Sequence, residues 1–166
     1  MTVEEPQPRG RLRPVERADL LAVVRIEEQT FERPWTLSTF EKFLDAQGFI
    51  VLEDPEGEAL GEAIAGYVVA ELVTVRGSQF GHVKDLAVKP ARQGAGRGRQ
   101  LLEGALRLLA SHGAKRVRLE VRPSNTRALS LYKNAGFEIL ARQEQYYPDG
   151  EDALLLARSL EGFSKS

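Results

Sequence analysis

The chain has 166 residues, enough for one compact domain that buries about two thirds of the surface its unfolded form would expose. Its 23 Lys and Arg nearly cancel its 24 Asp and Glu, which argues against direct nucleic-acid binding, and the absence of cysteine excludes disulfides, Cys-ligated zinc and an acyl-cysteine intermediate. No apolar run approaches the ~20 residues of a membrane span, and the acidic start lacks the features of a signal peptide, so we expect a cytoplasmic protein with no membrane partner.

The N-terminal half predicts three strands and two helices. Apolar residues at helical spacing indicate helices over residues 17–30 and 37–46, and the first of them carries an acid in line with its apolar residues. Short apolar or β-branched runs indicate strands over residues 11–15, 49–53 and 63–72. A Pro-Glu-Gly turn joins the last two strands, so we expect them to form a hairpin.

The C-terminal half alternates strands with helices before it closes in a second hairpin. A strand over residues 80–88 precedes a glycine-rich loop and a helix that ends at residue 112. Apolar and polar residues then alternate over residues 116–121, which predicts a strand with one buried face. The next helix is capped by Ser124 or Asn125 and ended by Gly136, and residues 137–147 and 151–160 pair as the long final hairpin.

One α/β domain with mixed α+β character follows from this order. Residues 1–10 and 161–166 are polar and rich in Gly, Pro or Ser, so we predict tails on either side of a domain over residues 11–160. Only the central strand-helix-strand stretch demands a parallel pairing. We therefore predict a mixed, mostly antiparallel sheet of about seven strands, flanked on both faces by four helices.

The loop Arg92-Gln93-Gly94-Ala95-Gly96-Arg97-Gly98-Arg99 predicts a phosphate site. It lies between a strand and a long helix, where backbone N–H groups and the helix dipole converge, and its arginines add positive charge. The alternative is a flexible loop that only caps the helix. No Gly-Lys-Ser or Gly-Lys-Thr follows, which excludes a P-loop. The third glycine of the dinucleotide fingerprint is missing, although Glu120 stands where a ribose-binding acid would, so a dinucleotide oxidoreductase stays as a rival.

The spacing Gln93-x-x-Gly96-x-Gly98 resembles the acyl-CoA motif of the GNAT acetyltransferases, and further motifs resemble the N-terminal protein acetyltransferases of that superfamily. The likeness covers about residues 11–160. Gln93 stands where many members have Arg. Pro34-Trp35 resembles the bacterial branch, whereas the acidic run after Pro148 resembles the archaeal one, so substrate preference follows from neither. The further motifs are residues 81–88 and 119–125, Ala128-Leu129-x-Leu131-Tyr132, Gly136-Phe137, and residues 146–153.

The resemblance implies acetyl-CoA as co-substrate and no metal. It implies that the sheet splays beside residues 119–121 and that the acetyl-CoA cleft lies in this opening. One strand edge would present amides to the pantetheine arm, the glycine loop would hold the pyrophosphate, and one side chain of the next helix would contact the pantetheine. The implied cofactor residues are Leu86, Ala87 and Val88 on the strand, Gln93, Gly94, Ala95, Gly96, Arg97, Gly98 and Arg99 in the loop, and Asn125 and Tyr132 on the helix.

Three side chains are candidates for the chemistry. By resemblance, Glu120 is the general base for the amine, directly or through water, and Tyr132 is the acid that protonates the CoA sulfur. His82 is a candidate to share the base role, because imidazole titrates near neutrality. The alternatives are that Glu120 is a strand acid paired with Arg118 or Arg122, that Tyr132 is a core residue, and that His82 is a surface residue.

The resemblance places the acceptor between the loop that joins the first two helices and the final hairpin. Aromatic and apolar side chains of the loop would line a small pocket for the first side chain, and two tyrosines would bind the peptide backbone. One acid matches a residue that some relatives use near the amine. Any of the aromatics is alternatively ordinary core. The implied residues are Phe31, Glu32, Pro34, Trp35, Tyr146 and Tyr147.

An N-terminal α-amine is the acceptor that the chemistry favours. Its pKa lies near 8 against about 10.4 for lysine, so its neutral fraction at pH 7 is roughly a hundredfold larger. The expected partner is therefore a protein or peptide N-terminus, with ribosome or nascent-chain association as an open possibility. Acetylation of lysine or of a small-molecule amine, and a non-catalytic acyl-CoA-binding module, are the other interpretations.

Overall fold

The computed structural model describes residues 10–55 and 63–163. Within these residues, one sheet has seven strands in the order β1-β2-β3-β4-β5-β7-β6, and its only parallel pair is β4 with β5. The predicted mixed, mostly antiparallel sheet is confirmed. The strands are β1 (Arg11–Pro14), β2 (Ile50–Glu53), β3 (Ile64–Val75), β4 (Ser78–Val88), β5 (Arg116–Val121), β6 (Glu138–Gln143) and β7 (Ala153–Ser159).

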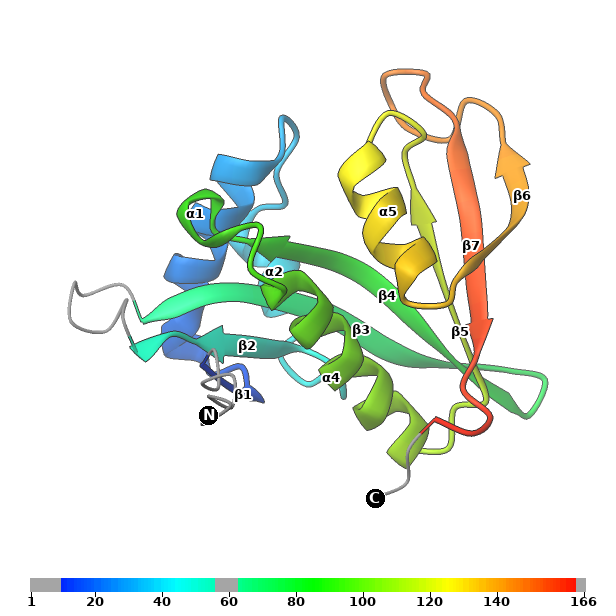
Figure 1. Cartoon of the computed structure of the whole chain (residues 1–166), viewed down its shortest axis with the longest axis horizontal. Helices are drawn as coiled ribbons and strands as arrows, with labels where there is room; N and C mark the ends of the chain where they lie inside the picture. Colours follow the sequence, from blue (N-terminus) through cyan, green and yellow to red (C-terminus); the bar gives the residue numbers. More distant parts are fainter. Residues whose placement is uncertain (1–9, 56–62, 164–166) are drawn as a thin grey trace, which may run out of the picture.

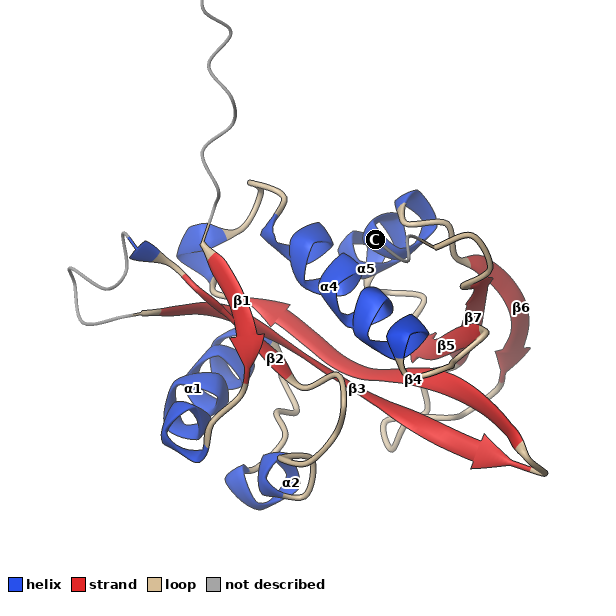
Figure 2. Cartoon of the chain, turned by 90° about the horizontal axis from the view of Figure 1, so that it is seen from below, coloured by secondary structure: helices blue, strands red, loops and turns tan. Residues whose placement is uncertain are grey.

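Four α-helices lie in the described part of the chain, two on each face of the sheet (Figure 1, Figure 2). One face carries α1 and α2, and the other carries α4 and α5, as the view in Figure 2 shows. A 3₁₀ turn leads into α1, and another precedes the glycine loop. The helices are α1 (Leu20–Thr30), α2 (Leu37–Glu41), α4 (Arg97–Ser111) and α5 (Thr126–Asn134), and the 3₁₀ turns are Arg17–Asp19 and Pro90–Arg92.

Strand β3 divides the hydrophobic core into two clusters. Tyr67 and Val69 pack under α1 and α2, while Val68 and Ala70 pack under α4 and α5. All four side chains are fully buried, because successive residues of a strand point to opposite faces and helices cover both faces here. The burial of this apolar surface on both sides makes the centre of the sheet a rigid support for the site.

Strands β4 and β5 diverge after two paired positions, which opens the sheet. Gly81 pairs with Val117 and His82 with Arg118, and β5 then continues beside β7 alone. A bulge in β4 opposite the step from Val69 to Ala70 bends the strand at the same level. The two ribbons separate visibly in Figure 1. The splay that the family resemblance implied is therefore present.

Two predicted elements are shorter than expected. Helix α2 ends at Glu41 rather than near residue 46, because the next residues form turns closed by i→i+3 hydrogen bonds, such as Phe43 N–H to Phe40 O at 3.0 Å. The final hairpin loses its ladder after Gln143, and residues 144–152 form a loop in which Gln145 has φ +50°. That loop carries both predicted substrate tyrosines.

The helix boundaries near the glycine loop and the splay were predicted more closely. Asn125 caps α5 by accepting a hydrogen bond from Ala128 N–H at 3.1 Å, and Gly136 has φ +92° just after the helix. Residues 1–9, 164–166 and most of the predicted Pro-Glu-Gly turn lie outside the described residues. Near the C-terminal end of the described chain, Phe163 packs under the guanidinium of Arg158, 4.9 Å from its ring centroid.

Candidate active site

A cavity of about 250 Å³ lies where the glycine loop, the edge of β4 and helix α5 meet. The predicted cofactor residues come together in its lining, with the exception of Ala95. Strand β4 contributes an edge that is free of β5 at this level, because the sheet has already splayed. The predicted residues in the lining are Leu86, Ala87, Val88, Gln93, Gly94, Gly96, Arg97, Gly98, Arg99, Asn125 and Tyr132.

The N-terminus of helix α4 is built to receive an anion. Gly96 is the N-cap residue at φ +81°, and Gly94 precedes it at φ +85°, conformations that favour glycine. No side chain among the described residues caps this 15-residue helix. Its first-turn N–H groups and its dipole are therefore available to a phosphate group in the cavity.

The arginines of the glycine loop are paired within the protein. Arg92 and Arg97 approach the buried carboxylate of Asp54 at 3.2 and 3.5 Å, and Arg99 forms an ion pair with Glu103 at 2.8 Å. The free positive charge expected here is thus smaller than the sequence suggested. Backbone N–H groups have to supply more of the attraction for phosphate.

Arg127 brings a guanidinium to the same cavity, and the sequence analysis did not identify it. Its Nη1 donates to Oε1 of Gln93, whose Nε2 in turn donates to Val88 O at 2.9 Å. A positive charge from helix α5 therefore stands beside the position where the glycine motif of many relatives has Arg. The available signal was a single Arg two residues after the helix cap.

A second cavity, of about 570 Å³, adjoins the first through the splay. Glu120 and Tyr132 both line it, so the two candidate catalytic side chains share one space. Tyr132 also lines the cofactor cavity, which connects the two spaces at the point where β4 and β5 part. The residues common to both linings are Thr30, Phe31, Leu86, Asn125, Ala128 and Tyr132.

Glu120 is held by His82 across the splay. His82 Nε2 lies 2.6 Å from Glu120 Oε2, and because an ionised carboxylate only accepts, the imidazole donates. This hydrogen bond is the main cause that lowers the pKa of Glu120, and the charge of Lys84 adds to it. Glu120 is therefore ionised at neutral pH. His82 does not line either cavity and supports Glu120 from the side.

The alternative ion pairs of Glu120 are not the ones that form. Arg118 lies over the ring of Phe80, 3.9 Å from its centroid, and contributes to Glu120 only through its charge. Arg122 binds Asp149 and Glu151 at 2.8 and 2.9 Å. The neighbours in sequence are thus engaged elsewhere, and the partner of Glu120 comes from another strand.

Tyr132 combines the two roles that the sequence left open. It is 7% exposed and packs edge-on against Phe137, with ring centroids 5.7 Å apart, so it is a core residue. It also lines both cavities. Burial raises the pKa of its hydroxyl well above the usual value, so the phenol keeps its proton at neutral pH and is available as a donor.

The predicted acceptor residues divide into those at the cavity and those behind it. Phe31, Glu32, Trp35 and Tyr147 line the second cavity, whereas Pro34 and Tyr146 do not. The ring of Trp35 also packs in the α1–α2 core, against Phe40 at 5.2 Å and Phe43 at 5.4 Å. Tyr146 packs edge-on against Tyr147 at 4.9 Å. Burial raises the pKa of Tyr147 to about 12.

Comparison with known proteins decides the family. A model of the Acetyltransferase (GNAT) family matches residues 20–137, well over half of the chain. The chain belongs to this family. It is also similar to the [ribosomal protein bS18]-alanine N-acetyltransferase of Escherichia coli, with 32% identity over 151 residues that cover 86% of this chain and 93% of that protein.

One more relative and two solved structures are also similar to this chain. The N-alpha-acetyltransferase daf-31 of Caenorhabditis elegans is 37% identical over 113 residues, which cover 66% of this chain and 59% of that protein. The structure of Ard1 from Thermoplasma volcanium superposes with a TM-score of 0.81 at 24% identity, covering 92% of this chain and 98% of that one. The E. coli ribosomal-protein-S18-alanine N-acetyltransferase has a TM-score of 0.75 at 29% identity, with 90% and 93% coverage. The predicted family and the predicted GNAT fold are confirmed.

A buried acid pair belongs to this GNAT site, and sequence reasoning did not identify it. Glu27, 2% exposed, accepts hydrogen bonds from Trp35 N–H at 3.2 Å and from the hydroxyl of Tyr67. Asp85 accepts from Leu86 N–H at 3.0 Å, and its Oδ2 lies 3.3 Å from the oxygen of the same hydroxyl. Burial, together with the hydrogen bond and the charge of Glu27, raises the pKa of Asp85 well above its usual range. Asp85, in the lining of the second cavity, therefore keeps its proton to a higher pH than an ordinary aspartate does. We call this second cavity the acceptor cavity, after the predicted acceptor residues in its lining.

The loop between β6 and β7 is fastened to the end of β5. Arg122 binds both Asp149 and Glu151, and its guanidinium lies 3.9 Å from the ring centroid of Tyr147. Glu151 also accepts from Ser124 N–H at 3.0 Å. The acidic run that resembled one branch of the family is thus an anchor, because it holds Tyr147 over the cavity.

Two negative findings apply to residues 10–55 and 63–163. No helix there is long and apolar enough to cross a membrane. No group of three or more His, Asp or Glu side chains in this part is placed to hold a metal ion.

Proposed function

We propose that this GNAT enzyme transfers the acetyl group of acetyl-CoA directly to the N-terminal α-amine of a protein. The observation that carries the proposal is the shared lining of the two cavities, which brings Glu120 and Tyr132 into one space beside the glycine loop. The names of the E. coli and nematode relatives, for alanine N-acetyltransferase and N-alpha-acetyltransferase activity, support it.

Acetyl-CoA, when bound, supplies an activated thioester. Its diphosphate fits the N-terminus of α4, where Gly94 and Gly96 both have positive φ, open space surrounds Gly94, and no described side chain caps the helix. Arg127 adds charge beside Gln93. Amides of residues 86–88, on the edge of β4 that the splay leaves free, are placed to pair with the pantetheine arm as a strand partner would.

Proton transfers follow from the two side chains at the junction. Glu120, ionised and held by His82, takes the proton from the attacking amine, directly or through one water. As the new N–C bond forms and the C–S bond breaks, Tyr132 donates its proton to the leaving sulfur. In this scheme His82 positions Glu120 and stabilises its carboxylate. No covalent enzyme intermediate is needed, and the chain has no cysteine to form one.

The lining of the acceptor cavity suits an amine. Glu32 and Glu120 contribute carboxylates to it, and their negative charge attracts an ammonium group. An α-amine loses its proton far more easily than lysine at neutral pH, so a base of ordinary strength is sufficient. We therefore place protein N-termini ahead of lysine and of small-molecule amines. A ribosomal protein is one candidate acceptor, because the E. coli relative is named for bS18.

Mass spectrometry of two matched peptides tests the proposal. One peptide has a free N-terminus and no lysine, and the other has a blocked N-terminus and a single lysine. With purified protein and acetyl-CoA, we expect acetylation of the first peptide only. Acetylation of the second peptide alone would replace the α-amine with lysine as the acceptor. CoA binding without any transfer would indicate a binding module, and protection against heat by NADH but not by CoA would support the oxidoreductase.

A further inference from the structure

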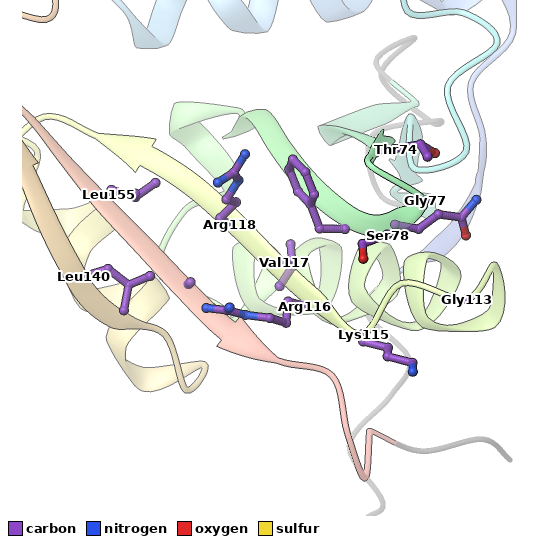
Figure 3. Close-up of a pocket in the computed structure, with 13 residues that line it drawn as sticks. Thr74, Gly77, Ser78, Gly113, Lys115, Arg116, Val117, Arg118, Leu140 and Leu155 are labelled. Carbon is purple, nitrogen blue, oxygen red and sulfur yellow. The ribbon is translucent and has the colours of Figure 1, made fainter.

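An open groove lies along the sheet beyond the acceptor cavity, and the two linings share no residue. It encloses about 750 Å³ beneath β5, β7 and the β3–β4 hairpin (Figure 3). Arg116 and Arg118 of β5 lie in it with Phe80 of β4, and Leu140 and Leu155 form an apolar side. The close-up shows α4 behind the sheet, so the groove lies on the opposite face. Helices α1 and α2 cover that face only under the other half of the sheet.

The alternation of β5 places this groove in line with the catalytic acid. Val117 and Val121 are buried in the core under α4 and α5. Residues 116, 118 and 120 therefore all point to the other face, because successive side chains of a strand alternate. Arg118 lies one step from Glu120 along this row and pairs in register with His82. The groove therefore lies along the same row of β5 side chains as Glu120.

The charged residues that line the groove are all basic. Its lining contains Lys115, Arg116 and Arg118 and no acidic residue, and every lining residue belongs to the described chain. All three basic side chains are exposed. None of them forms an ion pair with a residue of the described chain, and Arg118 only stacks over Phe80. Three unpaired cations beside an apolar wall are complementary to an acidic, extended chain segment.

We propose that the groove binds the acceptor protein downstream of its N-terminus and selects acidic residues there. This inference rests on the proposed function, since it takes the acceptor amine to lie at Glu120. Positions 118 and 116 are about 7 and 13 Å from position 120 along the strand. An extended acceptor advances about 3.3–3.6 Å per residue. Its third residue therefore reaches Arg118, and its fifth reaches Arg116.

Peptides that differ only at the third and fifth residues test this register. Three peptides carry Asp, Asn or Lys at both positions and share all other residues, and kcat/KM is measured at low and at high salt. We expect the Asp peptide to exceed the Asn peptide by about three- to tenfold at low salt. The Lys peptide should be the poorest. The differences should shrink at high salt, because these charges are exposed and are screened.

Matched double variants locate the effect. Arg116→Gln with Arg118→Gln should remove the preference for Asp and leave acetyl-CoA binding and the melting temperature intact. Arg107→Gln with Lys133→Gln makes the same change of net charge on exposed residues of α4 and α5, on the other face, and should keep the preference. Equal kcat/KM for the Asp and Asn peptides, or loss of the preference in both double variants, would overturn the groove proposal alone. Absence of acetylation on every N-terminus would overturn the proposed function and this inference with it.

Discussion

The cofactor side and the acceptor side of this GNAT enzyme are built in different ways. The cofactor cavity takes most of its lining from two continuous stretches, residues 86–99 and 125–132. The acceptor cavity draws on α1, the loop after it, β4, β5 and the β6–β7 loop. The first depends largely on backbone groups at a helix end and a strand edge, whereas the second depends on side chains that meet from distant parts of the chain.

The difference predicts which measured quantity each kind of change affects. A change on the acceptor side alters proton transfer or peptide binding, and the helix end and the strand edge that receive acetyl-CoA remain as they are. A change beside the glycine loop weakens acetyl-CoA binding and leaves Glu120 and Tyr132 in place. Paired measurements of kcat, peptide KM and acetyl-CoA affinity therefore test whether the two sides are separable.

The largest effect should come from Glu120→Gln. The amide keeps the shape but cannot take a proton, so we expect kcat to fall by about 10²–10⁴-fold. The dissociation constant for CoA, measured by calorimetry, should stay within about twofold of the wild type. A variant that lost CoA binding as strongly as activity would contradict the separation of the two sides.

Tyr132→Phe should come next. The ring keeps its edge-on packing against Phe137, so the melting temperature should change little, but the proton for the leaving sulfur is lost. We expect kcat to fall by about 10- to 100-fold, at the lower end of general-acid effects. Tyr146→Phe is the matched control, because that hydroxyl lies outside both cavities. Full activity in Tyr132→Phe would remove this residue from the chemistry.

Arg127→Gln tests the cofactor side. Loss of the guanidinium beside Gln93 should raise KM for acetyl-CoA about three- to tenfold, since a partly exposed charge contributes modestly to phosphate binding. The KM for the peptide should not change. Arg107→Gln, on the exposed side of α4, is the control for general loss of charge. An unchanged KM for acetyl-CoA would show that the backbone of the glycine loop is sufficient.

Asp85→Asn should have the smallest effect, which is a change in how the stability of the protein depends on pH. Because the pKa of Asp85 is raised in the folded state, the folded protein holds this proton more tightly than the unfolded chain. The free energy of unfolding should therefore fall as pH rises from the ordinary aspartate range through the raised pKa. The variant does not lose this stability. The melting temperature of the variant minus that of the wild type should therefore increase with pH, by about 2–4 °C for each kcal/mol of unfolding free energy.

Differential scanning fluorimetry measures this difference in melting temperature from about pH 5 to about pH 8.5, the range in which buried carboxyls titrate. Asp45→Asn is the matched control, because Asp45 is exposed. Its melting temperature should follow the wild type at every pH. A constant offset between Asp85→Asn and the wild type would contradict the raised pKa of Asp85.

Local sequence signals predicted the helix boundaries on the cofactor side well. Asn125 and Gly136 mark the start and the end of α5 as expected, since capping and a left-handed terminus are properties of a few neighbouring residues. The glycine loop lies at the start of α4 for the same reason. The pairing of the loop arginines with Asp54 was not predicted, because Asp54 belongs to a different part of the chain.

Local sequence signals did not predict the contacts on the acceptor side. Glu27 falls among the apolar residues of α1, and that pattern alone does not distinguish a satisfied buried acid from one at the rim of the helix. Its partners, Tyr67 and Asp85, lie on two other elements. The early end of the final hairpin also depends on a residue from another part of the chain. The anchoring of Asp149 and Glu151 to Arg122 competes with continued strand pairing.

The sequence by itself determined the order of strands and helices, the alternation of β5 and the glycine loop at the start of α4, because each depends on residues close together in the chain. Only the tertiary structure decided which partner each ionisable group has. His82 and Glu120 are 38 positions apart and meet at 2.6 Å. The pKa of a carboxyl depends on its distance from other charges and from water, and those distances exist only once the sheet has folded and splayed.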